Sequence, residues 1–204
     1  MGKKSNKDLF VDGFLKVLKE QQVDVRLKAR GSDKKASIYS HKLILSARSE
    51  VFKKMLESDK YKVSSRVMTI TFSKMKQEEL EAFVEFIYSD GSTLSEKAKQ
   101  HVKSLYRAAG KFEIPHLRDL CRDELVTSLN SSNALKVLEL AQIPFDKALS
   151  DAAFTVIKTF KSVISTSSEF KVFVVNHPDL TVEIMKSIST NVPYCSVCRR
   201  RRCY

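Results

Sequence analysis

The chain has 204 residues, of which 43% are hydrophobic and 29% are charged, with only 5 Gly and 4 Pro. This composition excludes the collagen-like, low-complexity and wholly disordered classes, and the length allows a buried core without disulfides. The net charge is +12, but Lys3, Lys4, Lys7 and Arg199–Arg202 supply seven of these charges and leave +5 for the body. Since nucleic-acid recognition needs cations clustered on one folded face, we do not expect nucleic-acid binding.

The N-terminal part of the chain predicts one helix. We expect residues 1–7 to be a flexible basic segment and residues 8–20 to be helical, because apolar side chains recur there at helical spacing. One stripe consists of Phe10, Phe14, Val17 and Leu18, and a second of Val11 and Leu15. This apolar arc is too wide for a single neighbour, so we expect the helix to pack against two.

The next segments mix strands and helices. Residues 23–29 and 36–40 alternate apolar with polar side chains on either side of the Gly31–Lys35 break, which predicts a β-hairpin. The period lengthens over 42–58, where Ser49 and Glu50 are suited to ending one short helix and starting another. A strand over 67–72 and a helix over 80–88 follow. The fold class is therefore α+β.

Beyond residue 91 the sequence predicts helices. They are expected over 95–109, with Gly110 as the C-terminal stop, over 115–129, from the Asn130–Asn133 caps to Gln142, from Asp146 to Phe160, and after Pro178. Residues 170–175 fit a helix or a short strand, because so short an apolar run has no distinctive period. Residues 191–204 show no period, and we expect them to be disordered.

The four cysteines do not form a secreted disulfide framework, since Cys121 stands alone and Cys195, Cys198 and Cys203 crowd the tail. The tail thiols leave a tetrahedral zinc shell one ligand short, so we expect no metal and no cofactor. Cys121 lies on the apolar side of its helix, where a packed thiol is the default. With no signal peptide or membrane-spanning run, we expect a cytoplasmic or nuclear protein and no membrane partner.

No pattern in the sequence indicates catalysis. The glycines are too scattered for a phosphate-binding loop, and neither a Gly-x-Ser-x-Gly elbow nor a His-Glu-x-x-His pair is present. His41 could be a base or a metal ligand, but no Cys, Asp or Glu stands at ligand spacing around it. We therefore interpret His41 as a buried, hydrogen-bonded structural residue and expect the protein not to be an enzyme.

Two runs carry a resemblance to a known family. Asp24-Val25-Arg26-Leu27 and the run from His41 to Phe52 resemble the most distinctive stretch of the BTB (POZ) domain. Val67–Phe72 and Phe83–Ser89 resemble its next strand and helix. The likeness covers residues 8–129, and residues 131–190 resemble the helical BACK segment. It implies a BTB/POZ fold, a small mixed sheet packed against helical hairpins, followed by an all-α segment, as in short plant-type BTB ubiquitin-ligase adaptors.

The resemblance implies a non-catalytic adaptor that dimerises, docks the scaffold protein cullin three and presents an unknown target for ubiquitination. Its dimer partner would be itself or another BTB protein. The implied dimer interface consists of Phe10, Phe14, Val17, Leu18, Asp24 and Arg48. The implied cullin-binding face consists of Met55, Leu56, Tyr61, Val63, Tyr106 and Phe112. An alternative is a nuclear interaction scaffold or transcriptional co-regulator, with the tail arginines serving nuclear import.

The sequence departs from such adaptors in two respects. Their cullin-contacting loop tends to hold a hydrophobic residue two positions before a Glu, whereas residues 58–63 contain no Glu. The 204 residues also hold no kelch, MATH or zinc-finger module for reading a target. We therefore expect cullin three to bind more weakly than it binds adaptors with the full loop.

Overall fold

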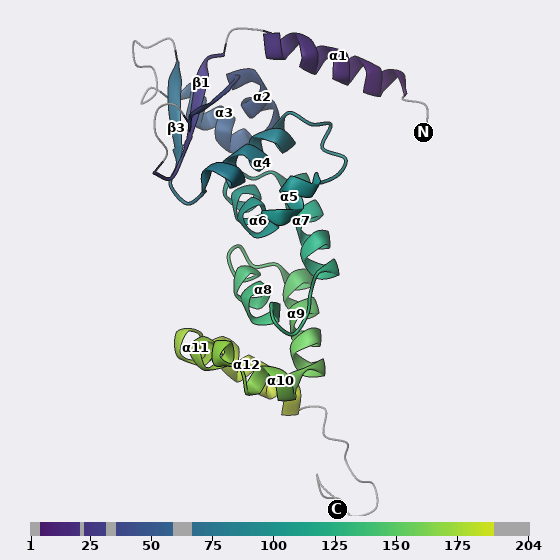
Figure 1. The fold of residues 1–204 in the computed structure, drawn as a ribbon, viewed down its shortest axis with the longest axis vertical. Helices are drawn as coiled ribbons and strands as arrows, with labels where there is room; N and C mark the ends of the chain where they lie inside the picture. The colour runs from purple at the N-terminus through teal and green to yellow at the C-terminus, as the bar shows by residue number, and fades with distance from the viewer. Residues whose placement is uncertain (1–4, 21–22, 32–35, 59–66, 190–204) are drawn as a thin grey trace, which may run out of the picture. The chain divides into compact units, whose positions relative to one another are not determined.

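The computed structural model describes residues 5–20, 23–31, 36–58 and 67–189. The chain divides into two compact units, residues 1–124 and residues 125–204. The first unit contains a three-stranded sheet with helices α1 to α6 and most of α7 (Figure 1). Helices α8 to α12 make up most of the second unit. The α+β prediction is confirmed.

The sheet is built around its middle strand. Strand β1 (Val25–Ala29) pairs antiparallel with β2 (Ile38–Ser40) and parallel with β3 (Met68–Phe72), giving the order β2-β1-β3. Alternate residues of β1 are buried, as the apolar and polar alternation of the sequence requires. The predicted hairpin and the third strand are both confirmed.

A single serine separates the two short helices that follow the hairpin. Helix α2 (Lys42–Arg48) ends and α3 (Glu50–Glu57) begins at Ser49, whose backbone is extended. The Ser49 hydroxyl oxygen accepts a hydrogen bond from the Phe52 amide at 3.1 Å, and the hydroxyl donates to the Phe112 carbonyl. Ser49 thus caps α3 and also ties it to the end of helix α6.

Four phenylalanines form the centre of the first unit. Phe52 of α3 stacks on Phe112 with ring centroids 4.3 Å apart, and both contact Phe72 of β3. Phe83 of α4 (Gln77–Ile87) completes the cluster at 6.3 Å from Phe52. One aromatic group therefore joins the sheet, α3, α4 and the end of α6.

The region predicted as one helix over 95–109 forms two. Helix α5 (Glu96–Gln100) ends at His101, whose amide donates back to the Ala98 carbonyl, and α6 (Val102–Lys111) begins where the His101 carbonyl accepts from Leu105. The predicted stop at Gly110 was wrong, because α6 continues to Lys111. Glu113, with a φ of 50°, makes the turn into α7 (Pro115–Thr127).

The second unit is a set of short helices. They are α8 (Ala134–Leu140), α9 (Lys147–Thr159), α10 (Lys161–Ser165), α11 (Ser168–Asn176) and α12 (Pro178–Ser189). Helix α9 packs against α8 and α12, and α11 packs against α8, α10 and α12. Residues 170–175 are helical, which settles the alternative between helix and strand. No helix among the described residues is both long and apolar enough to cross a membrane.

We expect Phe52→Ala to lower the free energy of unfolding by about 3 to 5 kcal/mol, because it removes a fully buried ring from the aromatic cluster. Urea denaturation followed by circular dichroism measures this loss. Lys53→Ala is the matched control, since Lys53 is exposed and its ion pair with Glu50 lies at the surface. A loss for Phe52→Ala as small as that of the control would contradict the central role of the cluster.

Candidate functional site

Helix α1 (Asn6–Glu20) exposes an apolar face. Phe10, Phe14 and Val17 are 72%, 48% and 56% exposed, and Leu18 is half-buried. The Phe10 and Phe14 rings stack with centroids 6.2 Å apart, so they form one continuous surface. Large apolar side chains gathered on one helix face are typical of an interaction surface. The sequence predicted this stripe from its spacing alone.

Asp24 and Arg48 do not form a pair with each other in the described structure. The Asp24 carboxylate accepts from the Lys42 amide at 2.7 Å. The Arg48 guanidinium donates to the carbonyls of Ile87 and Ser89. Each side chain therefore fixes the start or end of a neighbouring helix, and the role of both in a dimer stays a prediction.

His41 is a buried structural residue, as predicted. Its side chain is 7% exposed, and its Nδ1 lies 2.6 Å from the Tyr88 hydroxyl oxygen. The same oxygen accepts from the His41 amide at 3.0 Å and lies 3.0 Å from the Ser40 hydroxyl. Burial, together with the nearby Asp24 carboxylate, raises the pKa of Tyr88, which keeps the phenol neutral. This network joins β2, α2 and α4.

The structure corrects half of the predicted cullin-binding face. Leu56, Tyr106 and Phe112 are buried in the core, so their side chains offer almost no surface to a partner. Met55 is partly exposed on α3. Tyr61 and Val63 lie outside the described residues. Met55 is therefore the described residue of the predicted cullin-binding face that a partner could contact.

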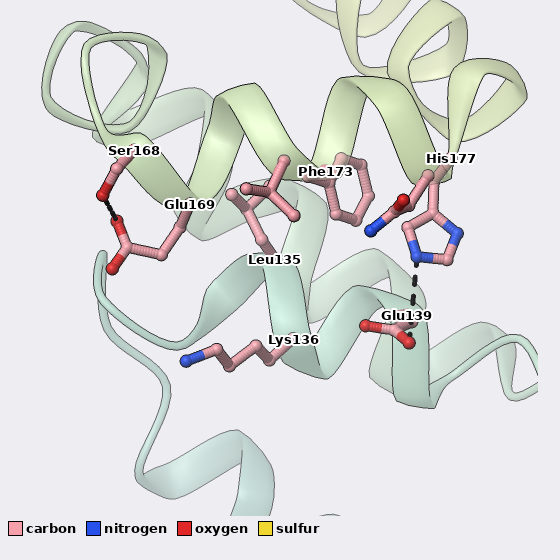
Figure 2. Close-up of a pocket in the computed structure, with 9 residues that line it drawn as sticks. Leu135, Lys136, Glu139, Ser168, Glu169, Phe173 and His177 are labelled. Carbon is pink, nitrogen blue, oxygen red and sulfur yellow. Dashed lines mark hydrogen bonds and ion pairs between the residues drawn. The ribbon is translucent and has the colours of Figure 1, made fainter.

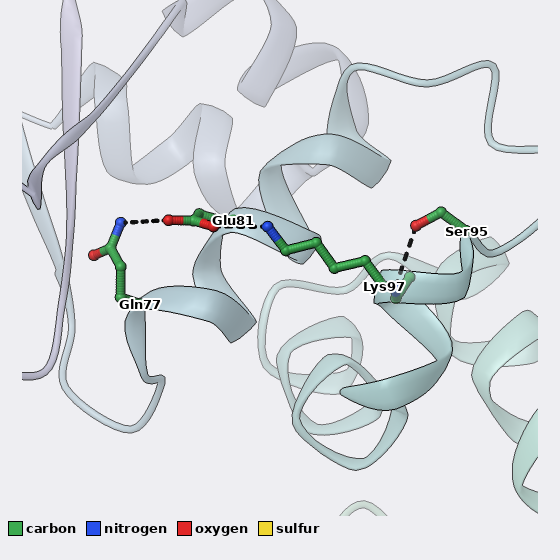
Figure 3. Close-up of polar contacts among 5 residues, drawn as sticks. Gln77, Glu81, Ser95 and Lys97 are labelled. Atoms are coloured by element: carbon green, nitrogen blue, oxygen red, sulfur yellow. Dashed lines mark hydrogen bonds and ion pairs between the residues drawn. The ribbon is translucent and has the colours of Figure 1, made fainter.

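Helix α5 is fastened to α4 by side chains at the surface. Figure 3 shows the Glu81 carboxylate between Lys97, whose ammonium lies 2.6 Å away, and Gln77, whose amide donates at 3.2 Å. These hydrogen bonds, that from Lys97 first, lower the pKa of Glu81 and keep it ionised. The Ser95 hydroxyl oxygen accepts from the Ala98 amide and caps α5. The contact positions the helices before α6 and is not a catalytic arrangement.

A groove in the second unit lies between α8 and α11. It is a hollow of about 320 Å³ whose lining includes Leu135 and Glu139 of α8 and Val172, Phe173 and His177 at α11. In Figure 2 the Phe173 and Leu135 side chains lie between the two helices, and His177 faces Glu139 across 3.8 Å. This groove was not predicted from the sequence, although the apolar run Val172 to Val175 could have indicated it.

Among the described residues, Cys121 is a free and buried cysteine. Burial, and secondarily the Glu124 carboxylate, raises the pKa of the Cys121 thiol to about 12, so the thiolate nucleophile is not formed at neutral pH. No cluster of three or more His, Cys, Asp or Glu side chains within this part of the chain could hold a metal ion. The predicted tail cysteines Cys195, Cys198 and Cys203 lie outside the described residues.

Comparison with known proteins gives a consistent result. The BTB/POZ domain family model matches residues 14–129. A protein of Arabidopsis thaliana named for its BTB/POZ domain is 61% identical over 207 residues, covering 98% of this chain and 99% of its own length. A second Arabidopsis BTB/POZ domain-containing protein is 58% identical over 201 residues, covering 97% of this chain and 90% of its own. Among solved structures, the BTB domain of zebrafish PATZ1 aligns with 63% of this chain and all of its own, at 16% identity and a TM-score of 0.44.

We expect His41→Ala to lower the free energy of unfolding by about 1 to 3 kcal/mol, because it removes a buried side chain and leaves the partly buried Tyr88 hydroxyl short of a partner. Thermal and urea denaturation by circular dichroism measures the change, and Tyr88→Phe should give a loss of similar size. Lys42→Ala is the control, since only its backbone amide takes part in the neighbouring contacts. An unchanged melting midpoint for His41→Ala would contradict a structural role for His41.

Proposed function

We propose, because the chain belongs to the BTB/POZ domain family, that it is a dimeric adaptor of a cullin three ubiquitin ligase. BTB/POZ domains are protein-interaction modules that mediate dimerisation and partner binding, and many serve as adaptors. The proposal rests on the family match over 14–129 and on the apolar face of α1, which remains largely exposed. Catalysis then belongs to the ligase, and this chain supplies contacts.

The α1 face supports the dimer. Phe10, Phe14 and Val17 lie at positions i, i+4 and i+7, on one side of the helix. Burying apolar surface contributes about 25 cal/mol per Å², so covering two large phenyl rings on each of two chains favours association. A twofold arrangement would place the same face of each chain against the other and cover both at once.

Helix α3 supports the cullin contact. Phe52 of α3 lies in the core, and Met55 of the same helix is partly exposed. The hydrogen bond from the Ser49 hydroxyl to the Phe112 carbonyl fixes the start of this helix. A rigid helix with an unbranched, adaptable thioether suits a partner surface. Residues 58–63 contain no Glu, so the proposed affinity rests on apolar contacts.

The second unit supports target presentation. The first Arabidopsis relative is matched over 99% of its length and 98% of this chain, so the similarity extends over both units. In this chain the second unit exposes the apolar side chains of Val163, Val172, Val175, Val182 and Met185. Exposed apolar side chains of this kind offer a binding surface where larger adaptors use a separate module. In the alternative function, a nuclear scaffold or transcriptional co-regulator, the chain would form the same dimer but would not bind a cullin.

We expect the purified chain to have the mass of two 23.2 kDa chains, and Phe10→Asp with Phe14→Asp to convert it to a monomer. Charges on the α1 face oppose burial of that face, so the dimer loses its apolar contact. Light scattering coupled to size exclusion measures the mass. Lys16→Glu, an exposed change elsewhere on α1, should leave the dimer intact. A wild-type monomer would refute the proposed α1 interface.

We expect direct binding to the N-terminal region of cullin three, weakened at least about tenfold by Met55→Asp, a change of about 1.4 kcal/mol. A buried charge in place of an apolar anchor removes contact area and adds a desolvation cost. Isothermal titration calorimetry measures the affinity, and Tyr61→Ala should also weaken it if Tyr61 contacts the cullin.

The matched control is Val182→Asp, which places the same charge on an exposed apolar position of the second unit. It should leave cullin affinity unchanged. Failure of the wild-type chain to bind at millimolar concentration would reject the adaptor in favour of the scaffold.

A further inference from the structure

The α8–α11 groove has the shape of a site for a peptide segment. Beside the hollow of about 320 Å³ lies a second of about 200 Å³, and Leu135, Lys136 and Glu169 line both. The first hollow lies between α8 and α11, and the second is also lined by residues of α10 and by the serines before α8. Small-molecule and peptide sites begin at about this volume. An elongated ligand fits such a lining better than a compact one.

The floor of the groove is apolar and the rim is charged. Leu135 and Phe173 are buried below the opening, and Val172, which is 60% exposed, stands at its edge. Glu139 and Glu169 carry two negative charges on the lining against one positive charge on Lys136. Hydrogen bonds from its own amide and from the Ser168 hydroxyl lower the pKa of Glu169, so this carboxylate is ionised at neutral pH.

This chemistry selects a ligand with apolar residues followed by cations. Apolar side chains would cover Phe173 and Val172, and guanidinium groups pair with carboxylates through two parallel hydrogen bonds. The chain itself contains such a segment, because Val192, Tyr194 and Val197 precede Arg199–Arg202, with Cys198 between them. The adaptor function proposed above gives this basic tail no role.

The segment can also reach the groove. Helix α12 ends at Ser189 and packs against α11, which forms one wall of the groove. An extended chain spans about 3.3 Å per residue, so residues 190–204 can cover on the order of 50 Å. Helix α11 is 9 residues long, or about 14 Å. The tether is therefore long enough to bring the arginines to either end of the groove.

We propose that residues 192–202 dock in the α8–α11 groove of their own chain, with their apolar side chains over Val172 and Phe173 and their arginines toward Glu139 and Glu169. The tail then competes with any partner segment of the same apolar-and-basic chemistry. The contact lies within the second unit and does not depend on cullin binding, so either proposal can fail without the other.

Hydrogen exchange of the full-length protein, kept reduced and measured by mass spectrometry, tests the contact. A short tether gives an effective concentration in the millimolar range, so even a weak site should slow exchange of the residue 192–202 amides about tenfold relative to the same sequence as a free peptide. Glu139→Lys with Glu169→Lys should abolish this protection by charge repulsion. Val172→Asp should also abolish it, by placing a charge on the apolar side.

Adding Arg200→Glu and Arg202→Glu to the double lysine variant should restore the protection, which also shows that the unit remains folded. The matched control is Asp151→Lys with Glu183→Lys, the same charge change at exposed positions of the second unit outside the groove. This control should keep the protection.

Three results would overturn the proposal. The first is exchange of the wild-type tail amides as fast as in the free peptide. The second is a loss of protection in the control variant equal to that in the double lysine variant. The third is protection that rises with protein concentration, which would assign the groove to the tail of a second copy.

Discussion

The contact between Ser49, Phe52 and Phe112 is the constraint on which the first unit depends. The Ser49 hydroxyl caps α3 and donates to the Phe112 carbonyl, while the Phe52 and Phe112 rings stack at 4.3 Å. One hydrogen-bonded serine and one ring pair thus fix α3 relative to the end of α6 and the sheet. A helix held at its first residue and along its buried side presents its remaining side chains in a defined orientation.

The surfaces proposed to bind partners are the apolar side chains that this core does not use. Met55 follows the buried Phe52 by one turn of α3 and remains partly exposed, and Phe10 and Phe14 project from a helix with a largely exposed apolar face. In the second unit, Val172 and Val175 remain exposed although Phe170 and Phe173 of the same helix are buried. When a helix is apolar on two sides, one side can pack in the core of its unit, and the other stays available to bind a partner.

The sequence predicted the strands and most helices because their signals are local. Alternation over 23–29 and the Ser49-Glu50 pair each depend on near neighbours, and both predictions were confirmed. Burial of Tyr106 and Phe112 could not be predicted, because an aromatic side chain at helical spacing suits a surface or a core until the opposing element is known. The break at His101 and the groove around Phe173 likewise depend on contacts distant in sequence.

Native mass spectrometry of the full-length chain mixed with the N-terminal region of cullin three tests the central claim most directly, because it reports dimerisation and docking in one spectrum. An α1-mediated dimer with one α3 face per chain predicts a complex of two chains and two cullin regions. A spectrum that contains the free chain and the free cullin region, with no complex of the two, would contradict the adaptor account.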